Sequence, residues 1–318
     1  MSAHAPFRFG VQFSQLPAGE WQEWVEHVEA LGYASVLWPD HFGDQWEPVT
    51  ALAAVAAVTQ RVAVGSLVYD VDYRHPVVLA KAAATLQIVS GGRHEFGIGA
   101  GWMQSDYDEA GLPFDRAGVR IARLAEALAI LRSMWTNERT TFEGEHYRVR
   151  DVAAAAPLGA LPPPRLMIGG GGPKLLALAG AHADIVGLNP KVHEGRVTAG
   201  TAADCAPERM REKVRWVREA AEAAGRSADA IEWSSLVFVT ALTDDPKPLR
   251  EALAKGSGMT VEQVADCPLF LTGSPAEVRE RLERRREELG ISYVVVQARD
   301  REALETFAEH VVAPLSQR

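Results

Sequence analysis

Short apolar stretches alternate with segments of helical pattern along the whole chain of 318 residues. After the first apolar stretch, apolar side chains recur at the spacing of one helix face, at Trp21, Trp24, Val25, Val28 and Leu31. The pattern predicts eight strands, at residues 7–13, 35–39, 61–69, 94–101, 165–168, 183–188, 231–240 and 292–298. Strands that alternate with helices favour a parallel sheet, and eight strands are the number that closes a barrel. The sequence therefore predicts an α/β fold of the (β/α)8 TIM-barrel class.

Three stretches interrupt this alternation. Residues 102–115 are rich in loop formers, residues 136–164 lack a helical period, and residues 189–204 follow the sixth predicted strand. Barrels of this class grow by insertions in the loops that follow their strands. We therefore predict a single barrel domain, residues 1–318, with insertions in its βα loops around these three stretches.

Two late helices have clear start signals. Thr260 and Gln263 have the spacing of a capping box, and so do Ser274 and Glu277. In a capping box the first side chain accepts a backbone amide of the helix, and the second reaches back to the amide of the first. We expect a helix to begin at each of these two positions.

Composition narrows the class of partner. The chain is 47% hydrophobic and 24% charged, and its net charge of −9 argues against nucleic acid and anionic membranes as partners. No run approaches the ~18 apolar residues that span a bilayer, and the first residues lack the regions of a signal peptide. Cys205 and Cys267 sit in unrelated contexts, which suggests neither a disulfide framework nor a metal site. We expect a cytoplasmic protein that acts on a small molecule.

The fourth predicted strand ends in three alternating glycines, Gly97, Gly99 and Gly101. Alternate residues of a strand point to the same face, so one face here has no side chains. Such a face lets a flat ligand or another stretch of backbone approach closely. A plain barrel strand with a glycine-rich corner is the alternative interpretation.

The second predicted strand ends in Asp40 and His41. In these barrels the active site lies at the carboxyl ends of the strands. A histidine at that position can donate or accept a proton near neutral pH, and the adjacent carboxylate can raise its basicity or contact the ligand. In the alternative reading, Asp40 caps a turn and His41 only packs. Aromatic residues predicted at the same mouth are expected to line the substrate pocket; they are Phe13, Trp38, Trp46, Tyr69 and Trp102.

Four consecutive glycines follow the fifth predicted strand; we call Gly169, Gly170, Gly171 and Gly172 the glycine corner. Pro173 then opens a helix, and Lys174 follows it. Glycines let backbone amides approach a ligand, and a helix start carries partial positive charge, so the combination can bind phosphate. Lys174 would add charge, and a flexible turn is the alternative. The loop at residues 191–196 could reach the same ligand or lie free on the surface.

Other chemistries have little support. No two histidines have the spacing of a zinc-binding helix, and no Gly-x-Ser-x-Gly motif occurs, so we predict no metal site and no serine hydrolase. Asp106, Asp108 and Glu109 are expected to form a solvated or loop-capping cluster. Arg74 and its neighbours before the third helix are interpreted as mainly structural.

Together, these motifs resemble the luciferase-like flavin and deazaflavin oxidoreductases, a family of (β/α)8 barrels. The resemblance implies the deazaflavin coenzyme F420 as cofactor. It implies that Asp40 and His41 face the redox-active ring, with Trp46 similar to an active-site tryptophan of the family. It also implies a bulge with a non-prolyl cis peptide near Leu67 and Val68 that supports the ring. In the same way, Gly99, Gly101, the glycine corner and Lys174 are expected to contact the cofactor.

Trp102 departs from part of this family. The deazaflavin-dependent sugar-phosphate dehydrogenases carry a glutamate proton donor just after the glycine-rich fourth strand, where this chain has tryptophan. The departure argues against sugar-phosphate dehydrogenation and leaves the acid–base role to His41. We expect hydride transfer between F420 and a small apolar or aromatic substrate.

Two alternatives remain open at this point. One is a monooxygenase that uses reduced FMN, which would share the fold and the phosphate corner. The other is a catalytically silent barrel subunit that stabilises a partner chain. Family resemblance alone suggests a homodimer.

Overall fold

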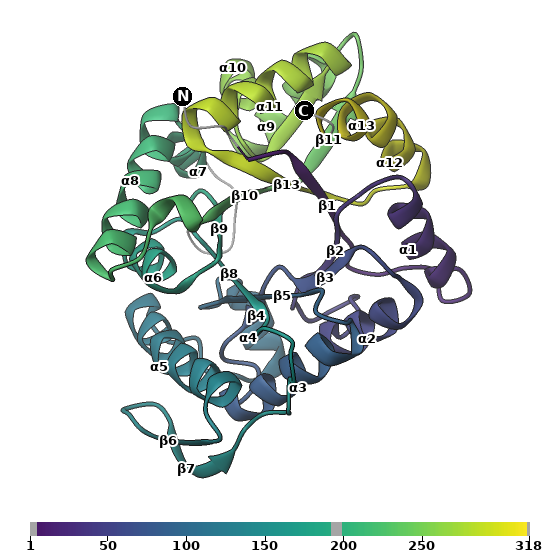
Figure 1. The fold of residues 1–318 in the computed structure, drawn as a ribbon. Coiled ribbons are helices and arrows are strands. Elements are labelled where there is room, and N and C mark those ends of the chain that lie inside the picture. Colours follow the sequence, from purple (N-terminus) through teal and green to yellow (C-terminus); the bar gives the residue numbers. More distant parts are fainter. Residues whose placement is uncertain (1–4, 192–198, 317–318) are drawn as a thin grey trace.

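The computed structural model describes residues 5–191 and 199–316. Its centre is a closed parallel barrel, seen along its axis in Figure 1. The strands are β1 (Arg8–Gln12), β2 (Ser35–Trp38), β3 (Ala63–Ser66), β4 (Tyr69–Asp70), β5 (His94–Gly99), β8 (Arg165–Gly170), β9 (Ile185–Leu188), β10 (Glu232–Val237) and β13 (Ile291–Gln297). They follow the order β3-β2-β1-β13-β10-β9-β8-β5-β4, and β3 also pairs with β5, which closes the sheet. β3 and β4 both pair with β5 and together take the place of one barrel strand, so the nine strands form a barrel of eight positions. The TIM-barrel prediction is confirmed.

A ring of helices covers the outside of the barrel (Figure 1). Its members are α1 (Trp21–Ala30), α2 (Pro48–Val58), α3 (Pro76–Val89), α5 (Ala117–Thr136), α6 (Pro173–His182), α8 (Pro207–Ala223), α11 (Pro275–Leu289), α12 (Arg301–Phe307), a π-helical turn (Ala308–Val312) and α13 (Ala313–Ser316). Among them, α2, α3, α6, α8 and α11 begin with proline, whose missing amide costs no helical hydrogen bond at that position. None of the helices in the described residues has the length and apolar character that a membrane span requires.

The three stretches that interrupt the alternation contain elements that the sequence pattern did not indicate. Within residues 102–115 the chain forms α4 (Gln104–Ala110), which ends at Gly111 in the left-handed conformation. Residues 136–164 hold the hairpin of β6 (Arg139–Glu143) and β7 (Arg148–Ala153), which projects from the ring in Figure 1. The last interruption ends in α7 (Ala199–Asp204). α4 is therefore a helix within a stretch that was expected only to be rich in loops.

The seventh predicted strand divides in two. β10 stays in the barrel, whereas β11 (Val239–Leu242) leaves it and pairs with β12 (Phe270–Gly273) in a separate sheet. Beside that sheet lie α9 (Lys247–Ser257) and α10 (Val261–Asp266). Both predicted capping boxes are present, at Thr260 on α10 and at Ser274 on α11.

The amino-terminal end of the barrel is crossed by a set of ion pairs that we call the floor network. Arg8 contacts Glu95 at 2.7 Å and Glu232 at 2.8 Å, and Arg165 contacts Glu232 at 2.9 Å. The Tyr293 hydroxyl, which points into the lumen, donates to Glu95 at 2.9 Å. All five residues lie at or near the starts of their strands, so they fill this end of the lumen and leave the opposite end for a ligand.

Candidate active site

His41 lies at the carboxyl end of the barrel, directly after β2, and is held by a buried carboxylate. Its Nδ1 is 2.6 Å from Oδ2 of Asp106 on α4, and the Tyr73 hydroxyl donates to the same oxygen at 3.3 Å. A carboxylate accepts from Nδ1–H, which leaves Nε2 to exchange a proton with a ligand. This arrangement can support general acid–base chemistry.

Asp106 corrects one sequence-based expectation. The side chain is 4% exposed, so it is not part of a solvated cluster, whereas Asp108 and Glu109 are exposed. The difference arises because α4 turns one face toward His41 and the other toward solvent. The aspartate was missed because the helix that orients it lacks a side-chain cap at its start.

Asp40 does not hold His41. Its Oδ2 accepts from Arg74 Nη1 at 2.6 Å and from the Asp70 amide at 3.0 Å, and Arg74 also contacts Glu47 at 2.7 Å. The expectation that Asp40 orients His41 is thus corrected, since that position belongs to Asp106. Contact between Asp40 and a ligand stays a prediction. Arg74, interpreted from sequence as mainly structural, is the counter-ion of Asp40.

A further group of acidic residues lies next to Asp40. We call Asp70 and Asp72, together with Tyr107 and Arg123, which contact them, the second acidic layer. The Tyr107 hydroxyl is 2.8 Å from Asp70 and 2.9 Å from Asp72, and Arg123 pairs with Asp72 at 2.6 Å. Burial raises the pKa of Asp70 to about 7. Gly101, at φ +67°, leaves the space that the Tyr107 hydroxyl occupies, because a side chain there would collide with it. We interpret Gly101 first as a packing requirement of this layer.

The side-chain-free face of β5 is occupied by backbone. A Cβ on Gly97 would collide with the Ser66 carbonyl, and one on Gly99 would lie 2.8 Å from Val68 Cγ2. These glycines therefore admit the bulge between β3 and β4. The bulge contains the non-prolyl cis peptide bond Leu67–Val68, which confirms the prediction of such a bond near these residues.

Two glutamines that the sequence analysis did not single out support the bulge from inside the barrel. Gln12 Nε2 donates to the Leu67 carbonyl at 2.8 Å, and Gln297 Nε2 donates to Gln12 Oε1 at 3.2 Å. Leu67 and Val68 are half-buried beside the lumen core. The available signal was a polar residue at the end of each of two apolar strands, β1 and β13.

The glycine corner begins with the last two residues of β8, which runs two residues beyond its predicted end, and packs against two neighbouring segments. A Cβ on Gly170 would lie 2.6 Å from Leu175, and one on Gly171 would lie 2.6 Å from the amide nitrogen of Lys191. Larger residues at these two positions would therefore displace the surrounding chain. Of the loop at residues 191–196, only Lys191 belongs to the described residues.

Gly172, the last glycine of the corner, has open space on the side where a side chain would lie. A Cβ on Gly172 would meet no atom within 4 Å, and Gly172 is the N-cap of α6 without a side chain to accept the first amides. Pro173 occupies the first turn and Lys174 is exposed. Free amides at a helix start beside a lysine fit a phosphate group.

Of the aromatic residues predicted to line a pocket, only two are accessible. Trp102 is 41% exposed and its ring meets the His41 ring edge-on at a centroid distance of 5.6 Å. Trp46 is half-buried and stacks on the buried Trp38 at 5.9 Å. The prediction is wrong for Phe13, Trp38 and Tyr69, which are at most 2% exposed because they pack into the core around the mouth.

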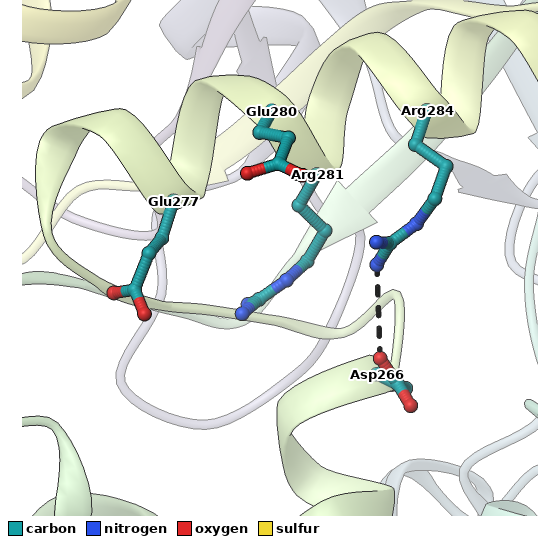
Figure 2. A pocket seen from close by; sticks show the side chains of 5 residues that line it. All are labelled: Asp266, Glu277, Glu280, Arg281 and Arg284. Carbon is teal, nitrogen blue, oxygen red and sulfur yellow. Dashed lines mark ion pairs between the residues drawn. The ribbon is translucent and has the colours of Figure 1, made fainter.

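One hollow lies beside the second acidic layer, and another lies between α10 and α11. One, of about 300 Å³, adjoins the second acidic layer and is lined by Val71, Asp72, Arg74, His75, Leu112, Pro113, Arg123 and Tyr147. The other, of about 240 Å³, lies between α10 and α11, where Figure 2 shows Arg284 pointing toward Asp266. Neither contains His41. In the part of the chain that the structure describes, no group of three or more histidine, cysteine or acidic residues is arranged to hold a metal ion.

Comparisons with known proteins agree with this architecture. An F420-dependent glucose-6-phosphate dehydrogenase of Intrasporangium calvum is 35% identical over 178 residues, which cover 51% of this chain and 52% of that protein. A protein of the same name from Segniliparus rotundus is 26% identical over 331 residues, with 92% of each chain covered. The chain spans about half the length of the first curated relatives it matches.

A solved structure extends the likeness to the whole fold. The F420-dependent tetrahydromethanopterin reductase of Methanopyrus kandleri has a TM-score of 0.76 at 22% identity, covering 98% of this chain and 100% of that one. A family model described as luciferase-like monooxygenase matches residues 3–266. Since this match takes in all of the barrel except β13, together with His41, the bulge and the glycine corner, the chain belongs to the luciferase-like monooxygenase family.

Proposed function

We propose that this protein is an oxidoreductase that transfers a hydride between coenzyme F420 and a small organic substrate. The observation that carries the proposal is His41, which is fixed by Asp106 after the carboxyl end of β2. The names of the Intrasporangium calvum and Segniliparus rotundus relatives support the choice of cofactor.

The residues present fit such a cofactor. When bound, F420 supplies a carbon that accepts or releases a hydride. Leu67 and Val68 would support its ring, and the amides and lysine at the glycine corner would hold its phosphate. His41 would donate or accept the proton at Nε2 while Asp106 keeps Nδ1 occupied.

The substrate we propose is apolar or aromatic. Two accessible side chains beside His41 are aromatic: Trp102 lies against its ring, and Phe42, the next residue and 40% exposed, packs at a tilt against Tyr73 at a centroid distance of 4.5 Å. Such surfaces suit an uncharged organic molecule better than a sugar phosphate. Incubation of the F420-bound protein with glucose 6-phosphate should leave the F420 absorbance unchanged, whereas a panel of apolar alcohols should contain a substrate. Reduction of F420 by glucose 6-phosphate would overturn the substrate assignment and leave the cofactor assignment intact.

Cofactor choice is tested by titrating the protein with F420 and, separately, with FMN while following tryptophan fluorescence. We expect quenching with a micromolar or tighter Kd for F420 and weaker binding of FMN. Preference for FMN would favour a monooxygenase that uses reduced FMN. Binding of neither would favour a catalytically silent subunit.

We further propose that the protein works in the cytoplasm as a homodimer that contacts through α2 and α3. These two helices contain one charged residue, Lys81, and their outer surface exposes Val78 (60%) and Val89 (50%). Outer faces with a single charged residue on neighbouring helices suit burial against a second copy. Light scattering should give a dimer for the natural protein and a monomer for Val78→Glu. A monomeric natural protein would contradict this proposal.

A further inference from the structure

The chain's two cysteines come together in the folded protein, although 62 residues separate them in sequence. The sulfurs of Cys205 and Cys267 are 3.3 Å apart, and both are free thiols. Cys205 is 6% exposed and Cys267 is 1% exposed. A disulfide needs an S–S distance of ~2.05 Å, so a small approach of the two side chains would suffice.

The pair lies in a small hydrophobic core of its own, outside the barrel. We call it the satellite core; its other buried members are Ala254, Met259, Val264, Leu269 and Phe270. Cys205 comes directly after α7 and Cys267 directly after α10. A bond between them would therefore join the segment after β9 to the segment that precedes β12.

The surroundings make Cys267 the more reactive thiol. The hydrogen bond with Cys205 lowers the pKa of Cys267, and the buried Arg285, whose Nη2 donates to the Cys267 carbonyl at 3.0 Å, acts in the same direction. The same contact raises the pKa of Cys205. Nucleophilic attack requires the thiolate, so we assign the first attack to Cys267. Asp266, the residue before Cys267, lines the hollow in Figure 2.

We propose that Cys205 and Cys267 are a redox modification site that forms a reversible disulfide with hydrogen peroxide. The Cys267 thiolate attacks one peroxide oxygen, the O–O bond breaks, and hydroxide leaves, which takes a proton to form water. The Cys205 sulfur then attacks the sulfenic acid at Cys267, loses its proton and releases a second water. Each sulfur is oxidised by one electron, and peroxide is reduced by two. In a reducing compartment the pair rests as thiols, and a thiol reductant restores it.

The disulfide would stiffen the chain next to the glycine corner. Asp204, the residue before Cys205, forms an ion pair with the fully buried Lys213. It also accepts a hydrogen bond from the backbone amide of Lys191. Lys213 Nζ also donates to the Asn189 carbonyl at 2.9 Å, and that carbonyl faces Gly171. A cross-link at Cys205 therefore anchors the segment that covers the corner.

The test is titration of the purified full chain with hydrogen peroxide, followed by intact mass and thiol counting under denaturing conditions. We expect the mass to fall by about 2 Da as both thiols disappear, and dithiothreitol to restore both. Peptide mapping without reduction should find Cys205 joined to Cys267. The oxidised protein should melt at a temperature higher by on the order of 5 °C, because the bond closes a long loop.

The single variants Cys205→Ala and Cys267→Ala provide the controls, since neither can lose 2 Da within one chain. If a variant does not fold, peptide mapping of the natural protein still decides the question. Addition of oxygen to one cysteine without loss of 2 Da, or cross-links only between chains, would overturn the proposal. The outcome does not depend on the cofactor, so it is distinguishable from failure of the proposed function.

Discussion

At the scale of single residues, the site depends on which carboxylate reaches which partner. His41 has an acidic neighbour in sequence, Asp40, and another in space, Asp106, and the structure pairs it with the second. The first is taken by Arg74, whose guanidinium lies 2.6 Å away. Adjacent residues after a strand point in different directions, so adjacency in sequence did not predict the pairing.

His41→Ala should lower the single-turnover rate of hydride transfer by about 10²–10⁴-fold, because the proton donor is lost. The Kd for F420 should stay within about threefold, since the glycine corner and the bulge are untouched. The matched control is His27→Ala, which removes a histidine that also pairs with a carboxylate, Glu305 at 2.7 Å, on the outside of the molecule. Equal rates for His41→Ala and the natural protein would remove His41 from the mechanism.

The second acidic layer predicts a dependence of stability on pH. The pKa of Asp70 is raised to about 7 in the folded protein and is ~3.9 in an unfolded chain, so folding favours the protonated form. The contribution of Asp70 to stability is therefore present below about pH 4 and is lost as the pH rises through about 7. Asp70→Asn should gain Tm relative to the natural protein between pH 5 and pH 8. The exposed Asp108→Asn serves as control, and a Tm difference for Asp70→Asn that is independent of pH would contradict the prediction.

At the scale of elements, periodicity located the barrel strands and most outer helices, because each has one face against the core. Periodicity failed for elements whose folding depends on contacts with distant segments of the chain. The short helix α4 has no capping side chain and is held by Tyr107 and Asp106, whose partners lie in distant segments. Likewise β10 and β11 form one apolar run in sequence, and only their pairing with different strands divides them.

Gly97→Ala tests the packing of β5 against the bulge. Its Cβ would collide with the Ser66 carbonyl and lie 2.9 Å from Val68 Cγ1, so we expect a loss of roughly 3 kcal/mol in unfolding free energy. Because the bulge must move, the affinity for F420 should fall as well. The control Gly118→Ala, on α5 with no atom within 4 Å of the added Cβ, should be neutral or slightly stabilising. A Gly97→Ala protein as stable as the control would show that the bulge yields freely.

At the scale of the whole molecule, the ion pairs that stabilise the barrel and the residues proposed to act in the chemistry lie at opposite ends of the barrel. The floor network crosses the amino-terminal end, while His41, the bulge and the glycine corner lie at the carboxyl end. The barrel class could be predicted from the alternation of strands and helices alone. The satellite core could not, because its cysteines are brought together by helices from separate insertions.

Glu95→Ala tests whether a change at the amino-terminal end of the barrel lowers stability without changing cofactor binding at the other end. The Glu95 side chain is 3% exposed and pairs with Arg8, so its removal leaves a guanidinium without its buried partner and should cost about 3 kcal/mol. Urea unfolding measures this loss, and the Kd for F420 should be unchanged. Glu143→Gln, in an exposed pair with Arg148, should leave stability within about 0.5 kcal/mol. A changed F420 affinity in the folded Glu95→Ala protein would contradict the division between floor and mouth.

The position of β13 between β1 and β10 also governs how the molecule is made. Residue by residue, β1 pairs with β13, which lies far from it in the sequence, from Arg8 opposite Tyr293 to Gln12 opposite Gln297. A nascent chain that has not yet released Ile291–Gln297 therefore carries two unpaired parallel edges, on β1 and on β10. Unpaired edges invite pairing with other chains. The hazard of association therefore lasts until β13 has been synthesised, and chaperones that shield these two edges before then would contribute most to the yield of folded protein.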